Sequence, residues 1–448
     1  MSKPYEWLFR RVLYPAYESG LRGRKTFAYL REYERNQWLS ADEIAALQWR
    51  KLKRLIEHCA AHVPYYQRRW RELGVAPADI RTLDDYAHLP LLTKQDIRDH
   101  RDELIAPALR PGLLYKTTGG STGEPLRFAY TRESNERRNA VMWRGYGWAG
   151  SRMGRRTLYL WGLPTSVPSR WKAFKEHSHH ALFGRTVLNS FHMTESNLSH
   201  YADRIERYRP EIIVGYVGPL VELASWLLAT GRRLPAPASL ITGAEALRDV
   251  QRAQLEQAFG CPAFNTYGCR EFMLIASECE QRNGLHLTAD HLLTEVVGAT
   301  PASPAGEVVV TDLHNDGMPF LRYANGDLAV PRHASCPCGR GLPMLSRIEG
   351  RRLDTIRTPD GRLLPGELFV TIFLDIPGVK RFQFVQRTLD SLTLTLVRDA
   401  DFDDATLARV RSSVESAIGR DLTLHIGFAD DIPVLANGKR RVTVSELT

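Results

Sequence analysis

A stretch rich in glycine and hydroxyl side chains, residues 115–128, has the composition of a phosphate-binding loop. It contains three glycines and four serine or threonine residues between two strand-like ends. Because glycine lacks a Cβ, the backbone N–H groups of such a loop can approach phosphate oxygens closely. It is not a Walker A loop, because Gly123 is followed by Glu124-Pro125 and not by lysine and serine or threonine. Taken alone, the stretch is also compatible with a surface hairpin that binds no ligand.

Four thiol and imidazole side chains form a second candidate site. Cys279 and His286 have Cys-x₆-His spacing, and Cys336 and Cys338 have Cys-x-Cys spacing. Thiolate and imidazole are ligands that zinc prefers, and four of them complete a tetrahedral structural site. Two alternatives stay open, namely unligated thiols beside an active-site crevice and redox use, and Cys269 is a possible substitute ligand.

Short apolar runs that alternate with helical patterns must position these residues. The strand-like runs are residues 157–161, 211–216 and 239–243, and the helical patterns are residues 196–208, 220–229 and 248–259. This alternation predicts a parallel sheet covered by helices. Ligands of such sheets bind beyond the carboxyl ends of the strands, so we expect the turns 215–218, 243–245 and 267–271 to share one crevice.

The length of 448 residues exceeds what one hydrophobic core usually supports. Residues 1–110 have helical patterns, an antiparallel β unit is expected from Gly306, and residues 352–448 mix strands with one helix. We predict an α/β protein with a large N-terminal domain, residues 1–351, of helix-covered parallel sheets plus a β subdomain. Residues 352–448 are predicted to form a small α+β C-terminal domain.

Charge and composition restrict the classes of partner. The 60 Lys and Arg residues exceed the 51 Asp and Glu residues by nine, but they are scattered, which does not indicate a nucleic-acid surface. No apolar run approaches the length of a membrane span, and no export signal is recognisable, so we expect a cytoplasmic protein without a disulfide framework. The basic and apolar run at residues 7–13 leaves weak contact with a membrane surface open. The oligomeric state is not predicted.

Six motifs, taken in order, resemble the successive core motifs of the adenylate-forming superfamily. Within it, the sequence is most similar to the phenylacetate–coenzyme A ligases and to their relatives encoded with capsule and exopolysaccharide genes. The resemblance extends from about Leu52 to Lys439, and its motifs are residues 117–125, 242–245, 267–271, 322–327, 350–351 and 438–439.

The resemblance implies an ATP-dependent activation of a carboxylic acid. The carboxylate attacks the α-phosphate of ATP, pyrophosphate leaves, and a second nucleophile takes the acyl group from the acyl-adenylate. It also implies that Glu271 binds Mg²⁺, that Asp327 accepts from the ribose hydroxyls with help from Arg351, and that Lys439 reaches the α-phosphate from a mobile C-terminal domain. The implied phosphate-binding residues are Thr117, Thr118, Gly119, Gly120, Ser121, Thr122 and Gly123, and the implied adenine-binding residues are Gly243, Ala244, Glu245, Tyr267 and Gly268.

The acid is expected beside Trp161, Tyr216 and Gly218, where turns after strands meet the crevice. Aromatic side chains there would suit an aryl or other apolar acid, although the same residues could be plain core.

The acceptor is the open part of the reaction, because the sequence departs from the ligase pattern after Arg351. The usual Asp-Asp pair and Arg-Gly loop are replaced by residues 352–361, with Asp354 as the nearest hinge candidate. The acceptor is therefore either coenzyme A or an amine or hydroxyl group in polysaccharide biosynthesis. A catalytically inactive nucleotide-binding protein is a further alternative, against which the intact Glu271, Asp327 and Lys439 argue.

Overall fold

The computed structural model describes most of the chain, in two compact units. The described residues are 3–117, 126–162, 180, 182–190, 193, 195–301, 303–351, 356–359, 363–364, 369, 372–373, 376, 378–419, 421–432 and 442–447. The N-terminal unit comprises Met1–Val297, Val308–Asn325 and Val330–Arg347. The C-terminal unit comprises Gly298–Glu307, Gly326–Ala329 and Ile348–Thr448.

An eleven-stranded sheet is the scaffold of the N-terminal unit, in the order β10-β11-β12-β13-β9-β8-β7-β6-β5-β3-β4. Strands β4, β3, β5, β6 and β7 pair in parallel, whereas β7–β8, β8–β9 and β9–β13 pair antiparallel. The predicted α/β fold class is thus confirmed, and the predicted β subdomain continues the parallel strands in one sheet. The strands are β3 (Thr157–Trp161), β4 (Arg185–Asn189), β5 (Ile212–Tyr216), β6 (Ser239–Gly243), β7 (Ala263–Tyr267), β8 (Ala276–Glu278), β9 (Leu285–Leu287), β10 (Leu292–Val297), β11 (Gly306–Asp312), β12 (Tyr323–Arg332) and β13 (Met344–Arg351).

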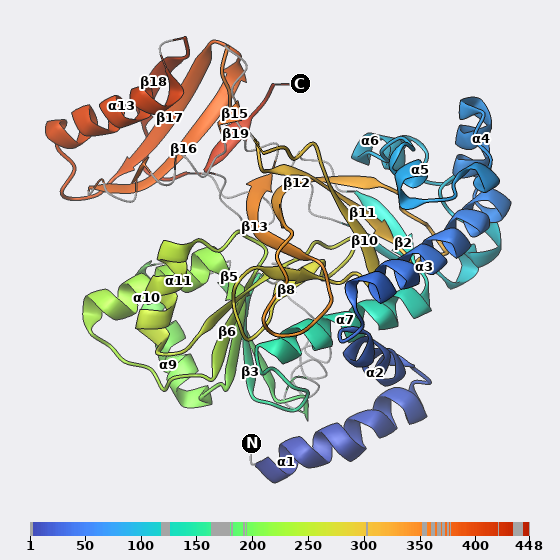
Figure 1. Cartoon of the computed structure of the whole chain (residues 1–448). Coiled ribbons are helices and arrows are strands. Elements are labelled where there is room, and N and C mark those ends of the chain that lie inside the picture. Colours follow the sequence, from blue (N-terminus) through green and yellow to red (C-terminus); the bar gives the residue numbers. More distant parts are fainter. Residues whose placement is uncertain are drawn as a thin grey trace. The chain divides into compact units, whose positions relative to one another are not determined.

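Strand β5 is apolar because helices cover both faces of the sheet at this strand. Helices α9 (Leu198–Tyr208), α10 (Val217–Thr230) and α11 (Asp249–Phe259) lie on one side, and α7 (Arg132–Trp148) lies on the other (Figure 1). Ile213 belongs to the core cluster of α9, α10 and α11, whereas its neighbours Ile212 and Val214 belong to a cluster with Tyr146 and Ala149 at the end of α7. Successive side chains of a strand point to opposite faces, so two helical layers require an uninterrupted apolar run.

The first hundred residues are mainly helical, as predicted. Helix α3 begins with a capping box, in which the Ser40 side chain accepts from the Glu43 N–H and Glu43 accepts from the Ser40 N–H. No helix within the described residues is both long enough and apolar enough to cross a membrane. The helices are α1 (Lys3–Leu8), α2 (Thr26–Asn36), α3 (Ala41–His62), α4 (Pro64–Leu73), α5 (Leu83–Ala87) and α6 (Lys94–Asp99), with π-helical turns at Phe9–Leu13 and Ala16–Leu21 and 3₁₀ turns at Pro77–Asp79, Pro107–Gly112 and Glu195–Asn197.

Two buried ion pairs hold α7 against the sheet. Arg144 donates to Asp290 at 2.8 Å, and Arg138 donates to Asp312 at 2.7 Å. The hairpin of β1 (Leu114–Thr117) and β2 (Arg127–Tyr130) directly precedes α7, and the Arg138 guanidinium lies 4.5 Å from the centre of the Tyr130 ring. The helix therefore positions the hairpin that carries the glycine-rich loop.

The C-terminal unit has its own small sheet, in the order β18-β17-β16-β19. Val410, Val414 and Ile418 of its helix α13 pack in one core cluster with Phe384 of β16 and Leu394 of β17. Its elements are β14 (Ile356–Arg357), β15 (Leu363–Leu364), β16 (Val379–Thr388), β17 (Ser391–Arg398), α13 (Asp404–Ile418), β18 (Thr423–Phe428) and β19 (Thr443–Ser445).

The variant Asp290→Ala is expected to lose about 3–5 kcal/mol of the free energy of unfolding, because it leaves Arg144 buried without its counter-charge. Urea unfolding followed by tryptophan fluorescence measures this loss. The matched control is Asp203→Ala, which removes the exposed partner of Arg232, 2.7 Å away, and should cost less than about 1 kcal/mol. Equal losses for the two variants would contradict the importance given to the buried pair.

Candidate active site and metal centre

The turns that follow β5 and β6 are joined by one hydrogen bond. Glu245, two residues beyond β6, accepts from the backbone N–H of Gly218 at 2.7 Å. Gly218 lies in the first turn of α10, where a carboxylate is favoured by the helix dipole. Ala244 adopts φ +67°, a left-handed conformation that non-glycine residues rarely adopt and that is often found at functional sites. Two of the three turns predicted to share a crevice therefore lie together.

The third turn, after β7, is held by residues at the start of β12. The side-chain amide of Asn325 donates to the Tyr267 hydroxyl at 2.7 Å, and the Tyr323 hydroxyl donates to a carboxylate oxygen of Glu271 at 3.3 Å. Glu271 is buried, with 7% of its surface exposed. Sequence reasoning did not select Asn325 and Tyr323 individually, although both lie within the quoted motif 322–327.

Gly268 occupies a position in this turn where no side chain fits. A Cβ at residue 268 would overlap the backbone carbonyl of Met273, which itself adopts φ +69°. The backbone of the turn is therefore packed against itself, which fixes the direction of Tyr267 and Glu271.

The remaining predicted nucleotide residues are only partly described. Thr117 is the exposed last residue of β1, Asp327 is buried in β12, and Arg351 is the last residue of β13. Asp327 and Arg351 are grouped with the C-terminal unit. The residues outside the described part of the chain are Thr118, Gly119, Gly120, Ser121, Thr122, Gly123 and Lys439.

Trp161 and Tyr216, two of the residues expected beside the acid, contact each other and are half-buried. The ring centres of Trp161 and Tyr216 lie 4.3 Å apart, at the carboxyl ends of the adjacent strands β3 and β5. Burial, with a further contribution from Glu245, raises the pKa of Tyr216 above its usual value. The pair lies at the strand end where the turns after β5 and β6 meet, although Trp161 also packs against the core cluster of Ile212.

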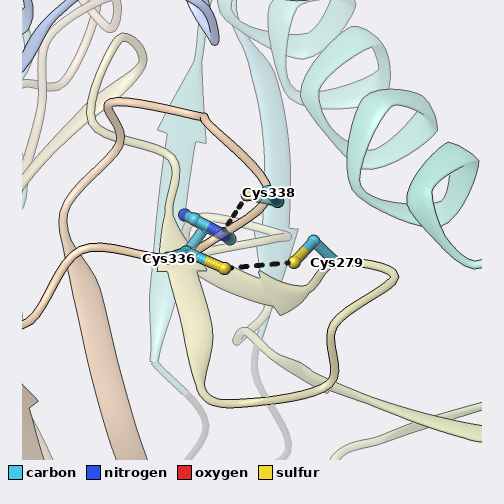
Figure 2. Close-up of side chains that lie close together, drawn as sticks. Cys279, Cys336 and Cys338 are labelled. Atoms are coloured by element: carbon cyan, nitrogen blue, oxygen red, sulfur yellow. Dashed lines mark hydrogen bonds between the residues drawn. The ribbon is translucent and has the colours of Figure 1, made fainter.

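The four predicted metal ligands converge in the N-terminal unit. The ligand atoms of Cys279, His286, Cys336 and Cys338 all lie within 4.8 Å of one another (Figure 2). The Cys279 and Cys336 sulfurs are 3.7 Å apart, and Cys338 Sγ lies 3.3 Å from His286 Nε2. Cys269 is not part of this group among the described residues. Cys279 directly follows β8, His286 is the middle residue of β9, and both other cysteines lie in the connection to β13, which pairs with β9.

The neutral imidazole of His286 can bind a cation placed among the three thiols. His286 Nδ1 lies 3.2 Å from the carbonyl oxygen of Leu342, which can only accept, so Nδ1 carries the proton and Nε2 presents a lone pair to the thiols. Burial lowers the pKa of His286 to about 4, which keeps the imidazole neutral. Burial, followed by contacts with Cys336 and Cys338, raises the pKa of Cys279 to about 12. A bound cation would lower the pKa of Cys279 again, because metal ligation requires and stabilises the thiolate.

Arg340 ties the cysteine loop to the N-terminal helices. Its guanidinium lies 4.9 Å from the ring centres of both Trp38 and Trp148, and it donates to Glu280 at 2.9 Å and to Gln37 at 3.2 Å. Although burial opposes ionisation of Cys338, hydrogen bonds from Arg340 lower the pKa of that thiol below its usual value.

Comparison with solved structures shows the fold. A crystal structure of 2-hydroxyisobutyryl-CoA ligase in the postadenylation state, in complex with 2-HIB-AMP, matches with a TM-score of 0.72 at 19% identity, over 92% of each chain. The fold is that of the adenylate-forming enzymes.

Comparison of sequences defines the family. The phenylacetate–coenzyme A ligase of Thermus thermophilus is 31% identical over 375 residues, which cover 80% of this chain and 82% of that protein. The protein CapK of Staphylococcus aureus is 23% identical over 433 residues, 95% of this chain and 94% of that protein, and the family model of the CapK C-terminal domain matches residues 356–446. The chain belongs to the phenylacetate–coenzyme A ligase family. It is an adenylate-forming ligase, which activates a carboxylic acid with ATP as an acyl-adenylate.

The variant Gly268→Ala is expected to weaken ATP binding by at least tenfold, roughly 1.4 kcal/mol, because the new Cβ must displace the backbone at Met273 and with it Tyr267. Isothermal titration calorimetry measures the affinity. The matched control is Gly147→Ala in α7, where an added Cβ meets nothing within 4 Å. Unchanged ATP affinity in a folded Gly268→Ala protein would show that this turn does not contact the nucleotide.

Proposed function

We propose that this ligase activates an aryl or other apolar carboxylic acid and transfers the acyl group to coenzyme A, as the name of its Thermus relative describes for phenylacetate. The observation that carries the proposal is the convergence of the turns after β5 and β6 beside the Trp161–Tyr216 pair. An open crevice at the carboxyl ends of parallel strands is where such folds bind ligands. The half-buried aromatic rings provide an apolar wall for the acid.

The proposed roles of the nucleotide residues follow from their surroundings and from the family motifs. Tyr267, oriented by Asn325, lines the adenine site with Gly243, Ala244, Glu245 and Gly268. Asp327 accepts from the ribose hydroxyls with help from Arg351, and the loop Thr117–Gly123 holds the leaving β- and γ-phosphates. These residues position ATP so that the carboxylate oxygen can approach the α-phosphorus.

Glu271 is the proposed Mg²⁺ ligand. Tyr323 engages one of its carboxylate oxygens at 3.3 Å, which orients the buried side chain. Carboxylate oxygen is the ligand type that Mg²⁺ prefers, so the residue fits the ion. Magnesium at this position would neutralise phosphate charge while pyrophosphate leaves. Lys439 is proposed to contribute a second positive charge at the α-phosphate.

A second acceptor class, an amine or hydroxyl group in polysaccharide biosynthesis, is favoured by one specific observation. The family model that matches residues 356–446 is that of the CapK C-terminal domain, and the similarity to CapK spans 95% of the chain. The alternative concerns the acceptor and leaves the proposed adenylation unchanged.

We also propose that Cys279, His286, Cys336 and Cys338 hold a structural Zn²⁺. Three thiols and one neutral imidazole with converging ligand atoms fit a closed four-coordinate zinc site, which has no open position for catalysis. The proposed zinc would join the β8–β9 hairpin to the loop that precedes β13.

Acid-dependent exchange between ATP and pyrophosphate tests the adenylation step. We expect exchange with one class among aryl, fatty, hydroxy and amino acids, with Mg²⁺ and without an acceptor. Lys439→Ala should reduce the rate by about 10²–10³, the usual cost of removing one positioned transition-state donor. The matched control is Lys380→Ala, an exposed lysine of the same unit, which should exchange at the wild-type rate. Wild-type exchange by Lys439→Ala would contradict the role given to Lys439, and absence of exchange with every acid would favour a catalytically inactive protein.

Mass spectrometry of the products distinguishes the acceptors. Incubation with the active acid and either coenzyme A or a set of amino sugars and amino acids should yield an acyl thioester if the first proposal is correct. An amide or ester in place of the thioester would establish the second.

Metal analysis of protein purified without a His-tag tests the zinc proposal. We expect about one equivalent of zinc, lost with a lowered melting temperature in Cys336→Ser and retained in Cys269→Ser, because Cys269 is outside the cluster. Less than about a tenth of an equivalent in the wild-type protein would exclude a structural zinc.

A further inference from the structure

The helical segment formed by residues 3–21 has an inner face that is well packed. Phe9 and Tyr14 are buried, and their rings pack against each other and against Phe183. Tyr14 also contacts Phe27 of α2 edge to face, at 5.2 Å. This aromatic cluster fixes the segment along the outside of the N-terminal unit, where Figure 1 shows it as the first helical ribbon, near α2.

The outer face of the same segment is apolar as well, although it is exposed. Trp7 is 59% exposed and Leu21 is 78% exposed, and several aliphatic side chains lie between them in sequence. A surface helix of a globular protein normally presents polar residues outward, and clustered exposed apolar residues mark an interaction site. The exposed apolar side chains of the segment are Trp7, Leu8, Val12, Leu13 and Leu21.

The charges on this face are positive. Arg11 and Arg22 are exposed, and neither forms an ion pair with an acidic residue among the described parts of the chain. The two acidic residues of the segment are already engaged, since Glu18 is buried beside Arg24 at 2.9 Å and Glu6 lies 3.6 Å from Arg155. The face therefore combines apolar side chains with guanidinium groups that are available to an anion.

An open cleft of about 450 Å³ adjoins the end of the segment. Leu21 and Arg22 line one side, Arg24 lies beside them, and the other side is formed by Leu114 of β1 and by Arg132 and Asn135 of α7. Arg22 and Arg132 beside two leucines suit an anionic phosphate group attached to an apolar chain, whereas Arg24 is already paired with Glu18.

We propose that residues 3–24 form a docking surface for an anionic phospholipid bilayer. Trp7, Leu8, Val12, Leu13 and Leu21 enter the boundary between headgroups and acyl chains, and Arg11 and Arg22 pair with lipid phosphates. One headgroup phosphate occupies the arginine-lined cleft. A helix with apolar residues and tryptophan next to arginine has the composition of an interfacial helix, and the charge selects anionic lipids. The surface is independent of the acid and acceptor proposed above.

Sedimentation of the full-length protein with vesicles tests the proposal. We expect binding to vesicles of phosphatidylcholine mixed with phosphatidylglycerol, at least about tenfold tighter than to phosphatidylcholine alone and weakened by added salt. Arg11→Glu/Arg22→Glu should lose this preference, and Trp7→Ser/Val12→Ser should weaken binding to both vesicle types. The matched control is Leu228→Ser/Val250→Ser, which alters exposed apolar residues of α10 and α11 and should bind as wild type.

Acid-dependent exchange of ATP and pyrophosphate should be unchanged in all of these variants, which shows that they fold. Absence of wild-type binding to the anionic vesicles would overturn the proposal, as would wild-type binding by both segment variants. Self-association that is abolished by Trp7→Ser/Val12→Ser, without vesicle binding, would assign the face instead to a contact between copies of the chain.

Discussion

The N-terminal unit depends on two buried arginines of α7, each of which must lie beside a buried carboxylate. Arg138 and Arg144 are both nearly inaccessible to water, and a buried guanidinium is tolerated only beside a carboxylate. Asp312, the last residue of β11, and Asp290, in the turn between β9 and β10, provide the carboxylates. The helix can therefore occupy one position only. Its first turn is continuous with the β1–β2 hairpin, and its last turn supports Ile212 and Val214 of β5, so the same two ion pairs help to place both this hairpin and the central strands.

The described part of the active site is built from backbone turns with little conformational freedom. Glu245 joins two turns by a single hydrogen bond, Gly268 leaves no space for a side chain, and Ala244 and Met273 both adopt left-handed backbone conformations. Such conformations cost about 1–3 kcal/mol each and persist where surrounding packing imposes them. The stable parallel sheet supplies that packing. In the proposed site, a rigid arrangement of this kind would orient nucleotide and acid before reaction, which is the main contribution that an enzyme can make to phosphoryl-type chemistry.

The sequence predicted the features whose signal is local. Uninterrupted apolar runs predicted β5 and β6, because both faces of those strands are covered, and Ser40 with Glu43 indicated the start of α3. Strand β4 was not predicted, because Arg185 and Asn189 at its ends interrupt the apolar pattern. The pairings of Asn325 with Tyr267 and of Arg340 with Trp38 join residues far apart in the chain, and no spacing rule encodes them. The convergence of Cys279, His286, Cys336 and Cys338 could be anticipated because thiol and imidazole side chains are chemically distinctive, whereas the arginine that holds their loop in place resembles any surface arginine.

The contacts that Arg340 makes with Gln37 and Trp38 have a consequence for the order in which the chain folds during synthesis. Gln37 and Trp38, just beyond α2, contact Arg340, and Gly341 donates its backbone N–H to the Gln37 carbonyl at 3.2 Å. A ribosome produces the N-terminal helices long before these partners emerge. Contacts of such large sequence separation form slowly, and undocked helices expose apolar surface in the meantime. The amino-terminal helices are thus made well before the residues that secure them, and they are among the last parts of the N-terminal unit to be held in place.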